Sequence, residues 1–153
     1  MSLDPGIEKV RHGFARSAFH TSFLGARLGE VEPGSVEVQL DVGTDHLNLF
    51  GTLHGGLIAT LADTATGLAM LTSLDDGMTH VTTSLSVTFL APARSGTVTA
   101  RGRVLKRGRR FGYAEADVVD ADGALLARAA ATFILSNESG SGGSRGAEPP
   151  DCQ

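Results

Sequence analysis

Residues 48–63, NLFGTLHGGLIATLAD, combine a glycine turn with a single carboxylate further along the chain. Gly55 and Gly56 allow backbone N–H groups to approach a ligand without an intervening side chain. A helix that begins at this turn adds partial positive charge, which stabilises an oxyanion. Asp63 has the chemistry of a general base or a nucleophile. The combination favours acyl-transfer chemistry that requires neither serine nor cysteine.

The spacing between the glycine turn and the carboxylate limits how they can act together. Asp63 lies seven to eight residues beyond the predicted helix start, so at 1.5 Å per residue it is ~11–12 Å from the N-terminal amides. One thioester or ester carbonyl cannot contact both groups. Either the two features are unrelated, or the helix of a second subunit supplies Asp63 to the glycine turn of the first. A two-fold dimer would then hold two identical sites.

The helix that carries Asp63 has an unusual surface. Asp63 is the only charged residue between Gly55 and Leu74, whereas a surface helix normally carries charged residues on its outer face. A carboxylate in a helix covered on nearly all sides is costly unless it is paired, hydrogen-bonded or protonated; the alternative to catalysis is a structural carboxylate satisfied by backbone groups. Small residues that permit close approach by a ligand or a second subunit share its face: Ala59, Thr60, Thr66 and Gly67.

The segments around this helix alternate apolar and polar residues, as half-buried strands do. In the run after the helix, Val81, Thr83, Leu85, Val87 and Phe89 share one face. A short helix is predicted over 7–19, and strands are predicted over 22–31, 35–42, 81–89, 97–106, 111–119 and 124–135. Two strands, a long helix and four strands predict an α+β fold with one helix packed on an antiparallel sheet.

Length and composition indicate one globular domain. The 153 residues divide into an N-terminal segment over 1–20, a domain over 21–136, and a tail over 137–153 that is predicted to be disordered because it has no aliphatic residue larger than alanine. The net charge of −4 argues against a nucleic-acid partner. No apolar run approaches the ~20 residues of a membrane span, and no signal-peptide pattern is present. We therefore expect no membrane partner and a cytoplasmic location.

Cysteine and histidine usage excludes several kinds of site. The single cysteine, Cys152, excludes a disulfide framework, a cysteine-based zinc site and a buried cysteine nucleophile. His46 and His54 are eight residues apart across a loop, which is not a metal-ligand spacing, and we expect no metal. The sequence has no serine-hydrolase elbow around the helix, and no P-loop or dinucleotide fingerprint.

Three segments carry a resemblance to a known family: Asn48-x-x-Gly51-Thr52-x-His54-Gly55-Gly56 followed by Asp63, then FLAPARSG over 89–96, and KRGR over 106–109. From about residue 34 to residue 135 the chain resembles the hotdog-fold acyl-CoA thioesterases, most closely the PaaI-like branch and its acyl-CoA thioesterase 13 relatives. The resemblance implies a hotdog fold, in which a curved antiparallel sheet of about five to six strands wraps a long central helix. It also implies a homodimer or homotetramer that hydrolyses acyl-CoA at a site shared between subunits. Coenzyme A is then part of the substrate, and no cofactor is expected.

The resemblance assigns roles to the residues around the glycine turn. Asp63 would activate water or attack the thioester carbonyl, and the Gly55 N–H of the other subunit would form the oxyanion hole. Asn48 would orient the carbonyl or the water, and His54 would organise the turn and Asn48. Thr82 stands where relatives can have a serine that helps to position water, so its hydroxyl is expected to substitute. Considered without the rest of the motif, Asn48 would be interpreted as a residue that caps a loop.

A basic turn in this acidic protein is the candidate contact for the phosphates of coenzyme A. Lys106, Arg107, Arg109 and Arg110 carry it, and guanidinium groups suit phosphate oxygens. The alternative is a solvated hairpin tip. The segment at the end of the preceding strand contributes Arg94 and Pro92 to the same expectation. Side chains suggested for the acyl tunnel are Phe50, Met70 and Leu74.

Two other functions stay open at this point. The first is a hotdog hydratase or dehydratase that acts on acyl thioesters, although those enzymes generally pair a histidine with a carboxylate at other positions. The second is a non-catalytic module that binds acyl-CoA without turnover. The sequence does not specify the acyl group, or whether Asp63 is the nucleophile or the base.

Overall fold

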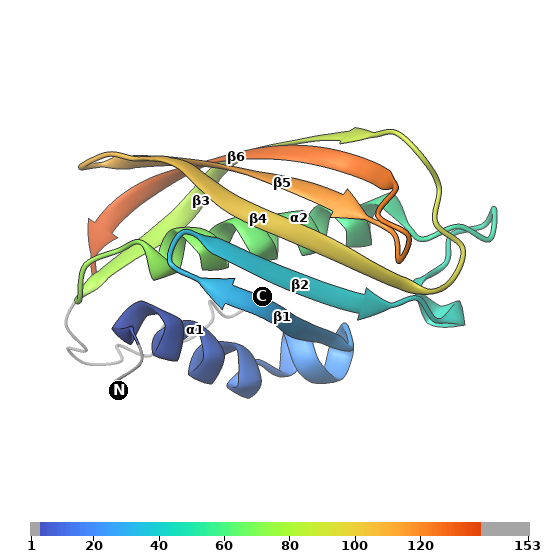
Figure 1. Ribbon diagram of the computed structural model, residues 1–153, viewed down its shortest axis with the longest axis horizontal. Coiled ribbons are helices and arrows are strands. Elements are labelled where there is room, and N and C mark those ends of the chain that lie inside the picture. The colour runs from blue at the N-terminus through green and yellow to red at the C-terminus, as the bar shows by residue number, and fades with distance from the viewer. Residues whose placement is uncertain (1–3, 139–153) are drawn as a thin grey trace, which may run out of the picture.

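The computed structural model describes residues 4–138. These residues form one antiparallel sheet of six strands with a long helix against it (Figure 1). In chain order the elements are α1 (Pro5–Arg16), the π-helical turn η1 (Phe19–Phe23), β1 (Ala26–Glu32), β2 (Ser35–Asp41), the 3-10 turn η2 (Thr44–His46), α2 (Gly55–Thr72), β3 (Met78–Phe89), β4 (Thr97–Arg107), β5 (Phe111–Val119) and β6 (Leu125–Asn137).

The strand order is β1-β2-β4-β5-β6-β3, so β3 lies at one edge of the sheet although it precedes β4 in the chain. The sheet curves around α2, and α1 packs on the helix from the side of β1 (Figure 1). This is the predicted arrangement of a central helix wrapped by an antiparallel sheet. The two strands before α2 and the four after it are all present, and the α+β prediction is confirmed.

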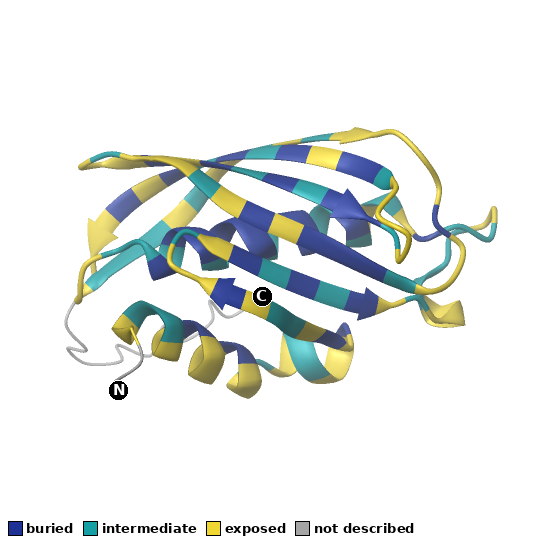
Figure 2. Ribbon diagram, viewed as in Figure 1, coloured by how far each residue is buried: buried dark blue, intermediate teal, exposed yellow. Residues whose placement is uncertain are grey.

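The core lies between α2 and the inner face of the sheet. Figure 2 shows buried and exposed residues alternating along the strands, as the pattern predicted. The helix contributes Leu61, Ala65 and Ala69, which are fully buried. A Cβ added to Gly102 on β4 would lie 2.3 Å from the Ala65 carbonyl oxygen, so only glycine permits this close contact between sheet and helix. Fully buried strand residues opposite are Val36, Val38, Leu40, Val98 and Val118.

The N-terminal segment differs from the prediction in its boundaries. The predicted helix over 7–19 is observed over Pro5–Arg16, because Asp4 caps it by accepting from the Gly6 and Ile7 N–H groups and proline suits the first helical position. The predicted strand over 22–31 begins only at Ala26. Residues before it are held in η1 by local backbone bonds such as that from the Leu24 N–H to the Phe19 carbonyl, 2.9 Å long. Local turn bonding therefore overrides strand pairing there.

The C-terminal strand extends past the predicted domain boundary. Asn137 belongs to β6 and pairs with Met78, and the Glu138 N–H donates to the Gly77 carbonyl. Glu138 also forms an ion pair with Lys9 of α1. The rest of the predicted tail, over 139–153, lies outside the described residues, as does Cys152. Across residues 4–138 no helix is both long enough and apolar enough to cross a membrane.

Candidate active site

The loop before α2 is held together by the side chain of Asn48. Its Oδ1 accepts from the N–H groups of Phe50 and Thr52, at 2.9 and 3.2 Å, and its Nδ2 donates to the Thr52 hydroxyl at 2.9 Å. The Asn48 N–H also donates to the Thr52 carbonyl, and Gly51 adopts φ +69°, a conformation that favours glycine. In this structure Asn48 is a loop cap. Its expected contact with a substrate carbonyl or water stays a prediction.

His54 is the N-cap of α2. Its backbone is extended, and its Nδ1 accepts from the Gly56 N–H at 2.9 Å, so the ring proton lies on Nε2 in the neutral side chain. The His54 carbonyl accepts from Leu57 and Ile58. Among the described residues no acceptor contacts the Gly55 N–H, the first donor of the helix. The turn thus presents Gly55 as an available donor at the positive end of α2.

Asp63 lies half-buried in the middle of α2, on the side that faces the edge strand β3. The hydroxyl of Thr82 donates to its Oδ1 at 3.0 Å. Both residues were predicted to belong to the site, and the structure brings them together within one chain. The bond satisfies one carboxylate oxygen, and within residues 4–138 no hydrogen bond engages the other oxygen.

A β-bulge in β3 aims Thr82 at Asp63. Thr82 pairs with Phe133 and Ser84 pairs with Thr132, so Thr83 is the extra residue. Before the bulge the even-numbered residues face α2, and after it the odd-numbered residues do. The prediction that Val81 and Thr83 share a face with Leu85 is therefore wrong: Val81 is 63% exposed on the outer face. Strict alternation fails because a bulge adds one residue to one strand only.

His80 is a residue near the site that sequence reasoning missed. It lies on β3 two residues before Thr82, and its ring packs edge-on against Phe133 with centroids 5.0 Å apart. Within residues 4–138 its buried Nδ1 has no hydrogen-bond partner. Burial lowers the pKa of His80; the Gly67 backbone and the charge of Asp63 act in the opposite direction, and Lys9 lowers the pKa further. Its only signal in the sequence is its position two residues from Thr82, which becomes informative once the bulge is known.

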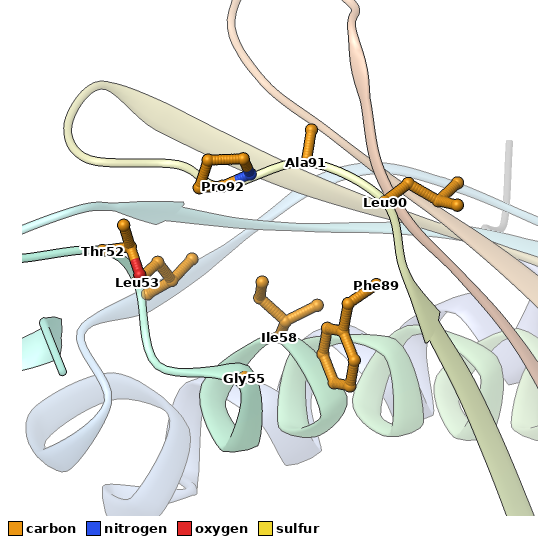
Figure 3. Close-up of a pocket in the computed structure, with 8 residues that line it drawn as sticks. All are labelled: Thr52, Leu53, Gly55, Ile58, Phe89, Leu90, Ala91 and Pro92. Carbon is orange, nitrogen blue, oxygen red and sulfur yellow. The ribbon is translucent and has the colours of Figure 1, made fainter. Parts of the chain in front are cut away.

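An apolar pocket of about 340 Å³ opens at the start of α2. Figure 3 shows Gly55 and Ile58 of the helix on one side and the segment Phe89–Pro92, which begins at the last residue of β3, on the other. A Cβ added to Gly55 would lie 3.3 Å from the ring of Phe89. Gly55 and Pro92, both predicted site residues, thus line the same pocket. Its remaining lining residues are Thr52 and Leu53.

The predicted phosphate contacts divide between the two ends of α2. Arg94 lies at the N-terminal end, where its Nη1 donates to the carbonyls of Phe50 and Gly51 at 3.3 Å each. The basic turn lies at the other end, where Arg107 pairs with Asp75 at 2.5 Å. Eighteen helical residues separate the two ends, which is about 27 Å. A single chain therefore does not bring the two groups together. Lys106 and Arg109 line a shallow surface pocket beside Arg107, and Arg110 is exposed next to them.

The side chains suggested for an acyl tunnel do not form one cavity. Phe50 is 83% exposed on the loop before α2, whereas Met70 is fully buried and packs against Gly112 of β5. Leu74 lies beyond the end of α2, beside a second group of buried residues that includes Met70. Over the described part of the chain no group of three or more potential ligands is placed to hold a metal ion.

Comparison with known proteins agrees with this fold. Residues 50–127, which include the glycine turn, Asp63 and Thr82, match the model of the thioesterase superfamily. Human acyl-coenzyme A thioesterase 13 is 35% identical over 139 residues, which cover 89% of this chain and 99% of the relative. A thioesterase family protein from Silicibacter pomeroyi superimposes with a TM-score of 0.81 at 30% identity, covering 86% of this chain and 98% of the other.

The PaaI protein of the E. coli phenylacetic acid degradation operon superimposes with a TM-score of 0.80 over 89% of this chain and 97% of the other. Its 24% identity supports the shared fold. The glycine turn, the central carboxylate and the wrapped helix therefore occur in the context that the resemblance implied. The chain belongs to the thioesterase superfamily and is a hydrolase of thioesters with a PaaI-like hotdog fold.

Proposed function

We propose that this protein hydrolyses an acyl-CoA thioester to the free acid and coenzyme A, with Asp63 of one subunit acting opposite the Gly55 N–H of another. The observation that carries the proposal is the half-buried Asp63, held at one oxygen by Thr82. The second carboxylate oxygen is then directed at a water molecule as a base, or at the carbonyl carbon as a nucleophile. The Gly55 N–H stabilises the oxyanion that forms in either case.

The exposed edge of β3 supports a site made by two subunits. β3 pairs with β6 on one side only, and a twelve-residue edge strand is a template for pairing with a second copy. A two-fold axis there sets the two α2 helices antiparallel. For Asp63 to reach the partner's Gly55, the axis passes close to Ala59, midway between them. Ala59 and Thr60 are only partly buried in the single chain, and small side chains at that point permit close helix packing.

The same symmetry accounts for the divided phosphate contacts. In an antiparallel pair centred near Ala59, the C-terminal end of one α2 extends past the N-terminal end of the other. The basic turn of one subunit is thereby directed toward the end that carries Pro92 and Arg94 of its partner. We propose that Lys106, Arg109 and Arg110 bind the phosphates of coenzyme A from there, with Arg107 partly neutralised by Asp75.

The first experiment measures hydrolysis of a panel of acyl-CoA substrates, aromatic and aliphatic, by wild type, Asp63→Asn and Asp63→Ala. We expect both variants to lose about 10³-fold or more in kcat. Full turnover in both would eliminate the role of Asp63. Enoyl-CoA in the panel separates hydration from hydrolysis, and acyl-CoA binding without turnover by wild type would identify a binding module instead.

The donor role of Gly55 has a matched pair of variants. Gly55→Pro removes the N–H and adds a pyrrolidine ring that the backbone accepts, because proline suits the first helical position and the extended His54 before it, with ψ 130°, suits a following proline. Gly55→Ala adds the same Cβ against Phe89 but keeps the N–H. We expect a loss of ~10²–10³ in kcat for proline and a much smaller loss for alanine. Equal losses would eliminate the donor role.

Subunit sharing is tested by mixing two inactive variants, Asp63→Ala and Gly55→Pro. If each site combines two chains, a mixed dimer holds one doubly defective site and one intact site. Random co-assembly at equal amounts makes half of the dimers mixed, so activity returns to about a quarter of the wild-type value. A site within one chain predicts no recovery.

A further inference from the structure

His80 and Thr82 form two successive contacts between the edge strand β3 and the central helix α2. Thr82 bonds to Asp63, and a Cβ added to Gly67 would lie 3.3 Å from Cε1 of His80. Residues two apart on a strand are separated by about 6.7 Å, and residues four apart on a helix rise by about 6 Å. The two contacts therefore match in spacing, and both depend on the face that the bulge at Thr83 selects.

The ring of His80 is confined on two sides. Gly67 provides the space on the helix, since any side chain there would have to displace the ring. On the sheet, the fully buried Phe133 contacts it edge-on at 75° between ring planes. Phe133 is also the pairing partner of Thr82. Phe133 therefore links the imidazole to the strand pair that carries the Thr82 hydroxyl.

Two helices carry charges that act on His80. Burial lowers the pKa of His80; the Gly67 backbone and the charge of Asp63 on α2 oppose this effect, and Lys9 of α1 adds to it. The lowered pKa favours the neutral ring near pH 7. Because electrostatic coupling is reciprocal, a protonated His80 would act on the Asp63 carboxylate as an opposite charge.

We propose that His80 is a positioning residue for Asp63: the neutral imidazole holds Thr82 against the carboxylate, and a proton on the imidazole suppresses activity in acid. This inference rests on the proposed role of Asp63. It assigns to the thioester site a histidine that lies outside the glycine turn and contacts no substrate.

A titration that does not depend on activity tests the coupling. The NMR titration of the His80 ring is followed in the wild-type protein and in Asp63→Asn, with the exposed His12 of α1 as internal reference. Removing the negative charge should lower the midpoint of His80 by about half a pH unit or more and leave that of His12 unchanged. Equal His80 midpoints in the two proteins would overturn the inference.

Kinetics then test the consequence for catalysis. We expect His80→Gln to lower kcat by about tenfold with KM nearly unchanged, and to remove one ionisation from the acid limb of the kcat profile between pH 5 and 8. The matched control is His20→Gln, because burial also lowers the pKa of His20 and its Nε2 lies 3.4 Å from the Thr64 hydroxyl, adjacent to Asp63. The control should keep the wild-type profile.

Two results separate this inference from the proposed function. If Asp63→Asn is inactive while His80→Gln superimposes on wild type at every pH, the inference alone fails. If Asp63→Asn keeps full activity, the proposed function fails first. Should His80→Gln not fold, His80→Asn and the titration in Asp63→Asn still decide the question.

Discussion

The two halves of the proposed active site, the turn at Gly55 and the surroundings of Asp63, are built in different ways. The turn at Gly55 is shaped mainly by contacts within ten residues: Asn48 holds Thr52, and His54 caps Gly56. Arg94 adds two longer-range bonds, to the carbonyls of Phe50 and Gly51. Asp63 instead depends on Thr82, nineteen residues away, and on a bulge that sets which side of β3 faces the helix. A local motif survives changes elsewhere in the sheet, whereas the Asp63 region responds to the register of a distant strand pair.

Giving Thr83 a partner on β6 is the most severe way to break this comparison. An alanine inserted between Thr132 and Phe133 removes the bulge, and uninterrupted pairing then turns the first half of β3 over, so that Val81 faces α2 and Thr82 faces outward. We expect kcat to fall by about 10³-fold or more. Deleting Thr83 also removes the bulge, but it leaves Thr82 paired with Phe133 and facing α2, so this control should retain most activity. An insertion variant as active as wild type would contradict the role of the bulge.

Replacing Thr82 tests the hydroxyl without moving the strand. Thr82→Val keeps the shape of the side chain and removes the donor to Asp63, and we expect kcat to fall by about 10- to 100-fold because a hydrogen bond to a charged group contributes roughly 1.5–3 kcal/mol. Thr82→Ser restores the donor and should recover most of the rate. Steady-state kinetics of the three proteins decide this. Equal rates for the Thr82→Val and Thr82→Ser variants would show that the Thr82 hydroxyl has no role in catalysis.

His54→Ala tests the turn at Gly55, where His54 is the N-cap of α2. The variant loses the acceptor for the Gly56 N–H, and we expect the free energy of unfolding to fall by about 1 kcal/mol, the usual cost of an N-cap. Asparagine, a strong N-cap residue, should restore much of that stability. Urea denaturation measures the difference. An alanine variant as stable as wild type would show that the imidazole does not cap α2.

The smallest expected effect is the pH dependence of stability from buried histidines. Burial lowers the pKa of His80 and of His20 in the folded protein. The unfolded chain therefore binds more protons near pH 6, and the free energy of unfolding decreases as the pH falls below about 6.5. Asp41 and Asp117 also have lowered pKa values, but their contribution is lost only below about pH 4.

Urea denaturation at pH 7.5 and at pH 5.5 isolates the histidine contribution, which we expect to lower the free energy of unfolding at the lower pH. His80→Gln should reduce the difference between the two pH values, and His20→Gln should reduce it independently. A difference that persists in the double variant would assign the effect to other groups.

Much of the fold was predictable because its signals are periodic. The six strands and the central helix follow from alternation and from the long apolar run around Leu61 and Ala65. The errors occur where local bonding competes with that periodicity. Residues 22–25 belong to η1 or to the turn that follows it, and Val81 faces outward because one unpaired residue in β3 reverses the alternation.

The candidate site also contains residues that the sequence indicated and one residue that it did not. Gly55, Gly56 and Asp63 were evident from residue types and helical spacing, and the same spacing showed that one chain cannot bring Gly55 and Asp63 to one carbonyl. His80 was not evident, because a single histidine in a strand has no spacing signal of its own. Its relevance depends on Gly67 and Phe133, which approach it only in the folded chain.

The amino-acid sequence by itself determined the elements and the turn at the start of α2, since the signals for both, apolar periodicity and turn residues, are read from residues close in the chain. Only the tertiary structure decided which side chains of β3 reach Asp63, and which end of α2 each basic group occupies. The physical reason is that a strand side chain points to one of two faces, and a single bulge, invisible to local periodicity, selects the face. The sheet thus supplies Thr82, a hydrogen-bond partner that α2 itself does not provide for the Asp63 carboxylate.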